Sequence, residues 1–139
     1  MTFSQAISSV FSKYATFSGR ASRSEYWYFV LLNIIITVAI YALGFATGSV
    51  RDSVHATAGG YGISCIEQLP AWVSVVTWIY SLAVLLPGLA VSVRRMHDIG
   101  KGGGWIFISL IPLVGPIWYL VLLLTGSEPA PNRFGEVPA

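Results

Sequence analysis

Three stretches of this chain contain no Asp, Glu, Lys or Arg: residues 26–50, 68–93 and 102–127. Each is 25 or 26 residues long, whereas a helix needs about 20 residues to cross a hydrocarbon layer of about 30 Å. A charged side chain at mid-membrane costs about 2.5–3.5 kcal/mol, so its exclusion from windows of this length indicates a lipid environment. We therefore expect three transmembrane helices, near residues 27–45, 72–93 and 105–124.

The composition supports this interpretation and excludes several other classes. Of the 139 residues, 55% are hydrophobic and 10% are charged, whereas soluble proteins carry roughly 25% charged residues. This hydrophobicity excludes intrinsic disorder, and a net charge of +2 is too small for a nucleic-acid-binding protein. A single cysteine excludes an internal disulfide framework and a multi-cysteine metal site. We expect one integral membrane domain over residues 1–139, without a metal or cofactor.

Aromatic residues mark the ends of the predicted spans. Trp27, Trp72 and Trp105 stand at the starts of the three windows, and Trp118 and Tyr119 lie toward the end of the third. Tryptophan and tyrosine favour the headgroup zone because an apolar ring carries one polar group. We interpret the three window-start tryptophans as interface anchors, with packing against neighbouring helices as the alternative.

Local signals also mark helix boundaries and breaks. Ser22 and Glu25 have the spacing of a capping box before the first span. Pro87 should kink the second span, and Pro112 and Pro116 should kink the third, with neighbouring helices or hydroxyl groups satisfying the freed carbonyls.

The first 18 residues predict an amphipathic helix that is too short and too polar to span. Its apolar residues recur at three- and four-residue steps. This helix could lie in the membrane interface, or its apolar face could pack onto the helix bundle. The apolar residues are Phe3, Ile7, Val10, Phe11, Tyr14 and Phe17. The fold class is thus an all-α membrane protein: an amphipathic interfacial helix, a three-helix transmembrane bundle and an irregular, proline-rich tail over residues 125–139.

Lysine and arginine are distributed unevenly around the predicted spans. The segment before the first span and the loop before the third hold six of the eight, while the other loop and the tail hold Arg51 and Arg133. The positive-inside rule then places the N-terminus in the cytoplasm and the C-terminus outside. This alternation also favours three spans over two or four.

Each of the three windows carries a stripe of small or polar residues at helical spacing, which in the third consists of Ser109, Pro112, Pro116 and Tyr119. Close packing and hydrogen bonds drive helix association in lipid, so these stripes should mark packed faces. Gly44 and Gly48 also form a small-xxx-small motif that could join two chains into a homo-oligomer. The predicted packing residues are Asn33, Thr37, Gly44, Gly48, Ser74, Thr77, Ser81 and Gly88.

The densest polar run follows the second window, from Arg94 to Lys101. Its cations favour the negative end of the helix, Gly100 should be the C-cap, and residues 102–104 should form a tight turn. Glu25 could pair with Arg94 or Arg95, and Asp98 with Arg20 or Arg23, which would leave an arginine to hold a lipid phosphate. The predicted cluster comprises Arg20, Arg23, Glu25, Arg94, Arg95, His97, Asp98 and Lys101.

Four motifs in this order resemble a known family. Residues 14–27, 94–101, 111–115 and 132–135 are similar to the small bacterial membrane proteins called domain of unknown function 805. The resemblance covers most of the chain, although Gly102–Trp105 departs from the family's usual Ser-Gly-Trp-Trp. It implies an inner-membrane location and supplies no reaction. Three spans place the tail motif opposite the arginine motifs, so there are two sites, a structural tail or a different topology. The tail motif is Asn132, Arg133, Phe134 and Gly135.

We therefore expect a non-enzymatic inner-membrane protein whose cytoplasmic arginine cluster meets anionic lipid headgroups or a partner protein. The alternative is a subunit of an oligomeric transporter or channel, suggested by the polar stripes, although no charged residue lies in them. The third possibility is an enzyme that uses His97 and Asp98, but catalysis there would require a second group such as Glu25. The other histidine, His55, and the only cysteine, Cys65, fall in the predicted outer loop.

Overall fold

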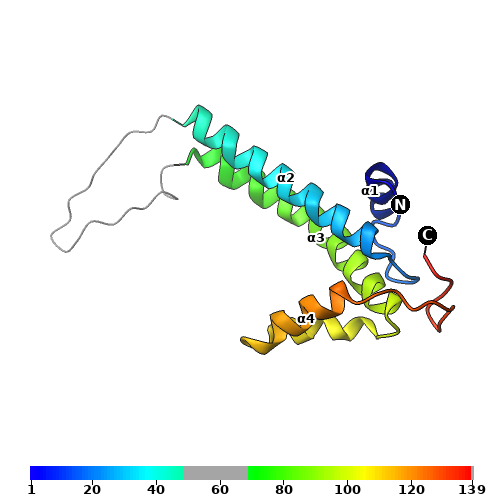
Figure 1. Cartoon of the computed structure of the whole chain (residues 1–139). Helices are drawn as coiled ribbons and strands as arrows, with labels where there is room; N and C mark the ends of the chain where they lie inside the picture. Colours follow the sequence, from blue (N-terminus) through cyan, green and yellow to red (C-terminus); the bar gives the residue numbers. More distant parts are fainter. Residues whose placement is uncertain (49–68, 139) are drawn as a thin grey trace. The chain divides into compact units, whose positions relative to one another are not determined.

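The computed structural model describes residues 1–48 and 69–138, and every named element in this part of the chain is helical. The predicted outer loop, with Arg51, His55 and Cys65, lies outside the described residues. The elements, labelled in Figure 1 except for η1, are α1 (Phe3–Ser12), α2 (Arg23–Thr47), α3 (Ala71–Asp98), the 3₁₀-helix η1 (Gly103–Leu110) and α4 (Val114–Leu124).

The helices α2 and α3 are long and apolar enough to cross a membrane. They contain 25 and 28 residues, and only 17% of the most apolar window of each is buried. Side chains such as Ile34, Val38, Trp78 and Leu82 are therefore exposed, which suits helices surrounded by lipid rather than helices in the core of a soluble protein. The first two predicted spans are confirmed as helices of spanning length and composition.

The chain divides into two compact units, to both of which α2 and α3 contribute. One unit comprises Asn33–Leu82, and the other comprises Met1–Leu32 together with Ala83–Ala139. The single domain over residues 1–139 remains a prediction.

Within the unit Asn33–Leu82, α2 and α3 pack through small and polar residues. Gly44 is buried, and a Cβ atom there would come within 2.6 Å of the Val73 side chain. The Tyr80 hydroxyl donates to Asn33 Oδ1 over 2.7 Å. These contacts lie within one chain, so they favour intrachain packing over the chain-joining alternative for Gly44.

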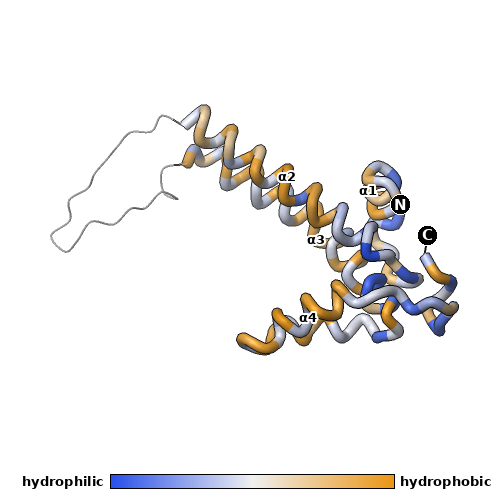
Figure 2. Tube along the Cα trace, in the orientation of Figure 1, coloured by the Kyte–Doolittle hydropathy of each residue, from blue (hydrophilic) through white to orange (hydrophobic). Residues whose placement is uncertain are grey.

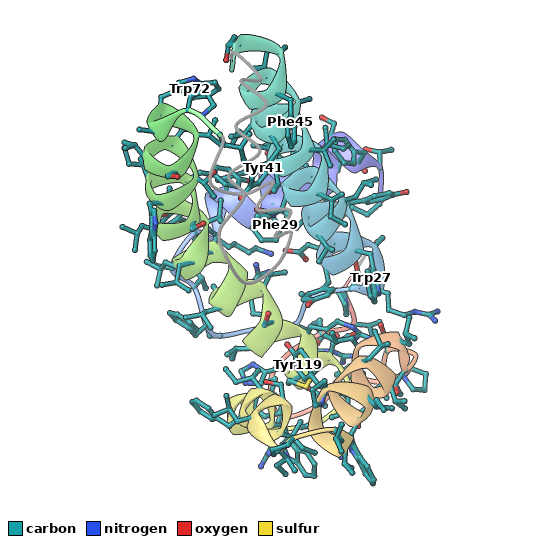
Figure 3. All side chains as sticks on the ribbon, turned by 90° about the vertical axis from the view of Figure 1, so that its left-hand side faces the viewer. Trp27, Phe29, Tyr41, Phe45, Trp72 and Tyr119 are labelled. Atoms are coloured by element: carbon teal, nitrogen blue, oxygen red, sulfur yellow. The ribbon has the colours of Figure 1, made fainter. Side chains whose placement is uncertain are left out.

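Other residues of the predicted stripes differ in exposure. Thr37, Gly48, Thr77 and Gly88 are partly buried. Ser74 and Ser81 are exposed, so these two hydroxyls lie outside the packed face. Tyr41, Phe45 and Trp72, labelled in Figure 3, are also exposed.

The prediction of a single helix over residues 105–124 is wrong. The third window contains η1 and α4, and the chain reverses at Ile111–Leu113, where Leu113 has a φ of 66°. Pro112 lies in the reversal itself, and Pro116 lies in the first turn of α4, where a proline is tolerated because its missing N–H would have no helical partner. The two arms pack against each other, and we call η1, the turn and α4 the hairpin.

The N-terminal helix is shorter than predicted, since α1 ends at Ser12. The Ser12 hydroxyl donates to the Ser9 carbonyl over 3.0 Å, a local bond that competes with the helical ladder. At the other end, Thr2 and Gln5 form a capping box that the sequence interpretation overlooked, although Thr-x-x-Gln is its signature. One face of α1 is buried through Ala6 and Val10, while Phe3, Phe11 and Phe17 are exposed.

The helix α3 continues through Pro87. A proline cannot donate to the carbonyl four residues earlier, which here belongs to Ala83. The Tyr14 hydroxyl donates to this carbonyl, so a hydroxyl group satisfies the bond that Pro87 leaves open, as expected for a membrane helix.

Two apolar clusters lie within the larger unit. Phe29 packs with Val10, Ala21 and Val91. Trp27 and Tyr119, labelled in Figure 3, pack against Met96, Leu122 and Leu123. The Trp27 ring also meets Tyr26 edge to face, so Trp27 is partly a packing residue rather than only an interface anchor.

Candidate functional site

Seven polar side chains are buried together where α3 ends, all within the unit formed by Met1–Leu32 and Ala83–Ala139. Figure 2 shows the hydrophilic segments gathered around this end of α3 and the returning tail. Six of the seven form what we call the polar cluster: Arg20, Glu25, Arg94, Arg95, His97 and Asp98. The seventh is Ser22, the N-cap of α2, whose hydroxyl accepts from the Glu25 N–H over 3.2 Å and confirms this half of the capping box.

Asp98 is the centre of the polar cluster and is fully buried. Its Oδ1 accepts from Arg20 Nη2 over 3.0 Å and from Arg20 Nε over 3.1 Å. Its Oδ2 accepts from Arg95 Nη1 and from the Ser127 hydroxyl. One carboxylate thus joins two arginines from different segments and the start of the tail.

Glu25 and Arg94 form a second buried ion pair, with 2.7 Å between Glu25 Oε1 and Arg94 Nη1. The same oxygen accepts from the Ser9 hydroxyl of α1 over 3.1 Å. Arg94 Nε and Nη2 are buried without a hydrogen-bond partner. Glu25 is therefore the group that compensates the charge of a side chain only 1% exposed.

Arg95 binds the carboxyl end of α4. Its Nε and Nη2 donate to the Leu123 carbonyl over 3.3 and 3.2 Å, and Nη2 also donates to the Thr125 carbonyl. These carbonyls lie at the negative end of the helix, where a cation is stabilising. Arg95 thus anchors the hairpin to α3.

Arg20 binds the tail. Its Nη2 donates to the Glu128 carbonyl over 2.7 Å, and its Nη1 donates to the Ala130 carbonyl over 2.9 Å. The Glu128 N–H in turn donates to the Asp98 carbonyl over 3.0 Å. A planar guanidinium with five donors can hold several oxygens in this way.

The tail motif folds back onto the last turn of α3. Asn132 and Gly135 bond to each other through their backbones, and the Asn132 side chain donates to the His97 carbonyl over 2.9 Å. The Phe134 ring stacks on the His97 ring with centroids 3.9 Å apart. His97 Nδ1 lies 3.0 Å from the Gly19 carbonyl, so Nδ1 must carry the proton because a carbonyl only accepts.

The loop after α3 starts as predicted and then differs. Gly100 has a φ of 72°, and its N–H donates to the His97 carbonyl, which confirms it as the glycine that ends α3. The predicted tight turn over residues 102–104 is wrong, because η1 already begins at Gly103. The Lys101 ammonium lies over the Trp105 ring, 4.2 Å from its centroid.

The structure joins motifs that the predicted topology separates. Asn132, Phe134 and Gly135 contact the segment and helix that carry Arg20 and His97. The prediction that the tail lies opposite the arginine motifs is therefore wrong, because the hairpin brings the chain back to the end of α3. The first, second and fourth motifs thus meet in one cluster, while the third motif, residues 111–115, forms the turn of the hairpin.

The burial of the arginines changes their expected role. Both predicted ion pairs are present, Glu25 with Arg94 and Asp98 with Arg20. The prediction that Arg20, Arg94 or Arg95 holds a lipid phosphate is not supported, because their side chains are buried. Arg23 is exposed and donates to the Leu124 carbonyl over 3.5 Å, and Arg133 is exposed over the Phe134 ring.

No group of three or more His, Cys, Asp or Glu side chains that could hold a metal ion occurs within residues 1–48 and 69–138. Asp98 and Glu25, the two buried acids, are each bound to arginine. The arrangement is suited to holding segments together.

Comparisons with known proteins agree with the membrane assignment. The sequence profile of the family described as Protein of unknown function (DUF805) matches residues 14–136. The chain is 37% identical to inner membrane protein YhaH of Escherichia coli (strain K12) over 129 residues, which cover 93% of this chain and 92% of YhaH. It is 32% identical to inner membrane protein YhaI of the same organism over 130 residues, covering 94% and 92%. No solved structure matches it.

Proposed function

Because this chain belongs to the family described as Protein of unknown function (DUF805), we propose that it is a non-enzymatic inner-membrane protein that binds anionic lipid headgroups on the cytoplasmic side. The polar cluster holds the cytoplasmic ends of α2, α3 and the hairpin together. The headgroups contact the basic side chains around this cluster. The observation that carries the proposal is the one-sided distribution of basic residues.

The distribution of basic residues supports an orientation with both termini in the cytoplasm. Seven of the eight lysines and arginines belong to the unit formed by Met1–Leu32 and Ala83–Ala139. The eighth, Arg51, lies in sequence between α2 and α3. With two spans and a returning hairpin, seven basic residues lie on one side of the membrane and one lies on the other. Three spans would divide them six to two, which follows the positive-inside rule less closely.

Among the described residues, four basic side chains lie outside the buried cluster, and we call them the basic rim: Lys13, Arg23, Lys101 and Arg133. Lys13, Arg23 and Arg133 are exposed, and Lys101 is partly buried. Each basic residue near an anionic membrane surface contributes about 1 kcal/mol. The rim is therefore better placed than the arginines of the polar cluster to meet headgroup phosphates.

The contacts of His97 and Asp98 favour a structural role over catalysis. Asp98 already accepts from two arginines, and His97 is stacked on Phe134 and bound to Gly19. A general acid or base needs a reacting group within hydrogen-bond reach. Both side chains instead use their bonding positions to hold the tail and the Gly19 segment.

The proposal is tested by lipid retention. The protein is purified from nanodiscs that contain phosphatidylglycerol and phosphatidylcholine, and retained lipids are counted by native mass spectrometry. Replacing the four rim residues by glutamine should lower phosphatidylglycerol retention at least tenfold, which is about 1.4 kcal/mol and well below the summed contribution of four charges.

The matched control replaces each rim lysine by arginine and each rim arginine by lysine, so that all four positive charges remain. This control should retain as much phosphatidylglycerol as the original protein. Equal retention by the glutamine variant and this control would show that the rim does not bind anionic lipid. Loss of a co-purifying protein from the glutamine variant, with lipid retention unchanged, would identify a partner protein instead.

A further inference from the structure

The hairpin is apolar on nearly every side, and the turn at its tip is the most exposed part. Leu113 is 84% exposed and Leu110 is 76% exposed, the two highest values among the large hydrophobic residues described. Phe107, Ile117 and Trp118 extend this apolar surface along both arms. Figure 2 shows the hydrophobic colour along α4. Such a tip is unfavourable in water, because two leucines protrude from it.

Both ends of the hairpin lie next to the end of α3, where the Lys101 N–H donates to the Met96 carbonyl over 3.0 Å. Lys101 lies over Trp105 where the first arm begins, and Arg95 binds the Leu123 and Thr125 carbonyls where the second arm ends. The tip is therefore the part farthest along the chain from both anchored ends. No Asp, Glu, Lys or Arg occurs between Lys101 and Glu128.

The length of each arm matches half of a bilayer. The 8 residues of η1, at about 2.0 Å each, and the 11 residues of α4, at about 1.5 Å each, both extend about 16 Å. The hydrocarbon core is about 30 Å thick. Neither arm is long enough to cross it, and both are long enough to reach its middle.

Three of the four backbone N–H groups of residues 111–115 donate to carbonyls of the chain. The Ile111 N–H donates to the Ile108 carbonyl, the Val114 N–H to the Pro112 carbonyl and the Gly115 N–H to the Ile111 carbonyl, over 2.8–3.1 Å. Pro112 and Pro116 have no N–H to satisfy. Unbonded backbone groups in lipid cost several kcal/mol each, and these bonds and Pro112 avoid that cost for the nitrogens of residues 111, 112, 114 and 115.

Gly115 allows the two arms to lie against each other. A Cβ atom at this position would come within 2.0 Å of the Ile108 carbonyl oxygen. The hairpin is thus closely packed at the tip, and the exposed side chains of Phe107, Leu113 and Ile117 face its surroundings.

We propose that the hairpin is a re-entrant membrane element: it binds the acyl chains of the leaflet next to the polar cluster and returns before reaching the opposite leaflet. Lipid chains, rather than a protein partner, are the occupant because the surface is uncharged and apolar all round, while its ends carry a tryptophan and basic side chains. That this leaflet is the cytoplasmic one rests on the proposed function. The depth of insertion does not.

The test measures depth at three positions along the hairpin. Single-cysteine variants Gly104→Cys, Phe107→Cys and Leu113→Cys, made with Cys65→Ser, are spin-labelled in phospholipid bilayers. Their collision rates with oxygen and with a water-soluble nickel complex are then compared. Oxygen accessibility should rise and nickel accessibility should fall from residue 104 through 107 to 113, with residue 113 near the bilayer centre. A label at 113 as accessible to nickel as a label at 104 would overturn the proposal.

Labelling with a membrane-impermeant maleimide separates a re-entrant hairpin from a full span. Leu113→Cys should react at least fivefold more slowly from either side than Glu136→Cys, an exposed tail control, and Glu136→Cys should react from one side only. Rapid reaction of residue 113 from the side opposite residue 136 would indicate a full span. Rapid reaction from the same side would indicate a hairpin outside the membrane. Either result would overturn the proposal.

Two features keep the test decisive. Leu110→Cys, which also alters an exposed tip residue, replaces Leu113→Cys if that variant does not assemble. The depth profile is independent of lipid headgroup charge, so a failed headgroup experiment and a failed depth experiment are distinguishable.

Discussion

At the scale of single residues, the decisive feature is the burial of three arginines with only two carboxylates. Arg20 and Arg95 share Asp98 and also bind backbone carbonyls. Arg94 depends on Glu25, because its other two nitrogens have no partner. Buried ion pairs add little stability compared with apolar residues, but removing one partner leaves an uncompensated charge and is strongly destabilising.

The first prediction concerns Glu25. Replacing it by glutamine (Glu25→Gln) should destabilise the protein by about 3–5 kcal/mol, because Arg94 would remain buried without a counter-charge. Thermal unfolding in detergent micelles measures this loss. Glu136→Gln removes a carboxylate from an exposed position and should change stability by less than about 0.5 kcal/mol.

A double variant distinguishes loss of charge compensation from loss of packing. Glu25→Met combined with Arg94→Met should be more stable than Glu25→Gln alone, because no charge is left buried. A Glu25→Gln variant as stable as Glu136→Gln would contradict the structure of this ion pair.

At the scale of elements, α1 and the residues just after it support α3 where Pro87 interrupts its hydrogen bonds. Its buried residues pack onto the larger unit, its Ser9 hydroxyl donates to Glu25, and Tyr14 just beyond it donates to the carbonyl that Pro87 leaves open. The exposed Phe3, Phe11 and Phe17 also leave an aromatic face available to lipid. The two alternatives for this segment, packing and interfacial binding, are therefore compatible.

The second prediction tests the contact that Tyr14 makes. Tyr14→Phe should destabilise the protein by about 1 kcal/mol, because the Ala83 carbonyl would lose its donor in an apolar environment. Tyr41→Phe is the matched control, since it removes the hydroxyl of another exposed tyrosine. Unfolding by denaturant in mixed micelles measures both, and equal stability of the two variants would argue against the contact.

At the scale of the whole molecule, two long helices and a returning hairpin account for three apolar windows. Arg20 binds carbonyls of Glu128 and Ala130, so the segment before α2 contacts the C-terminal tail. We therefore expect the two termini to face the same compartment.

The third prediction concerns the sides on which the termini lie. Green fluorescent protein fused after Ala139 should fluoresce, and alkaline phosphatase fused after Val50 should be active, because fluorescence requires the cytoplasm and phosphatase activity the outer side. Three spans predict the opposite result at Ala139. A fluorescent fusion at the N-terminus is the control, since both topologies place it in the cytoplasm.

The apolar windows and their basic flanks were enough to predict the helices α2 and α3. The capping signals were enough to predict the N-cap Ser22 and the glycine that ends α3. These features depend on local sequence: charge exclusion, helix caps and propensity act over a few residues. For each of Glu25 and Asp98 the sequence predicted two candidate arginine partners. The reason is that the ends of the first two predicted spans that carry these residues lie at the same membrane face.

Only the tertiary structure decided the third window and the tail. A span and a re-entrant hairpin exclude charge equally, so residues 102–127 do not distinguish them by composition. Pro112 and Pro116 are compatible with a kink or a reversal, and the packing of Gly115 against Ile108 belongs to the reversal. Once the chain turns back, Asn132 and Phe134 reach His97, a contact between residues far apart in sequence that no local pattern contains.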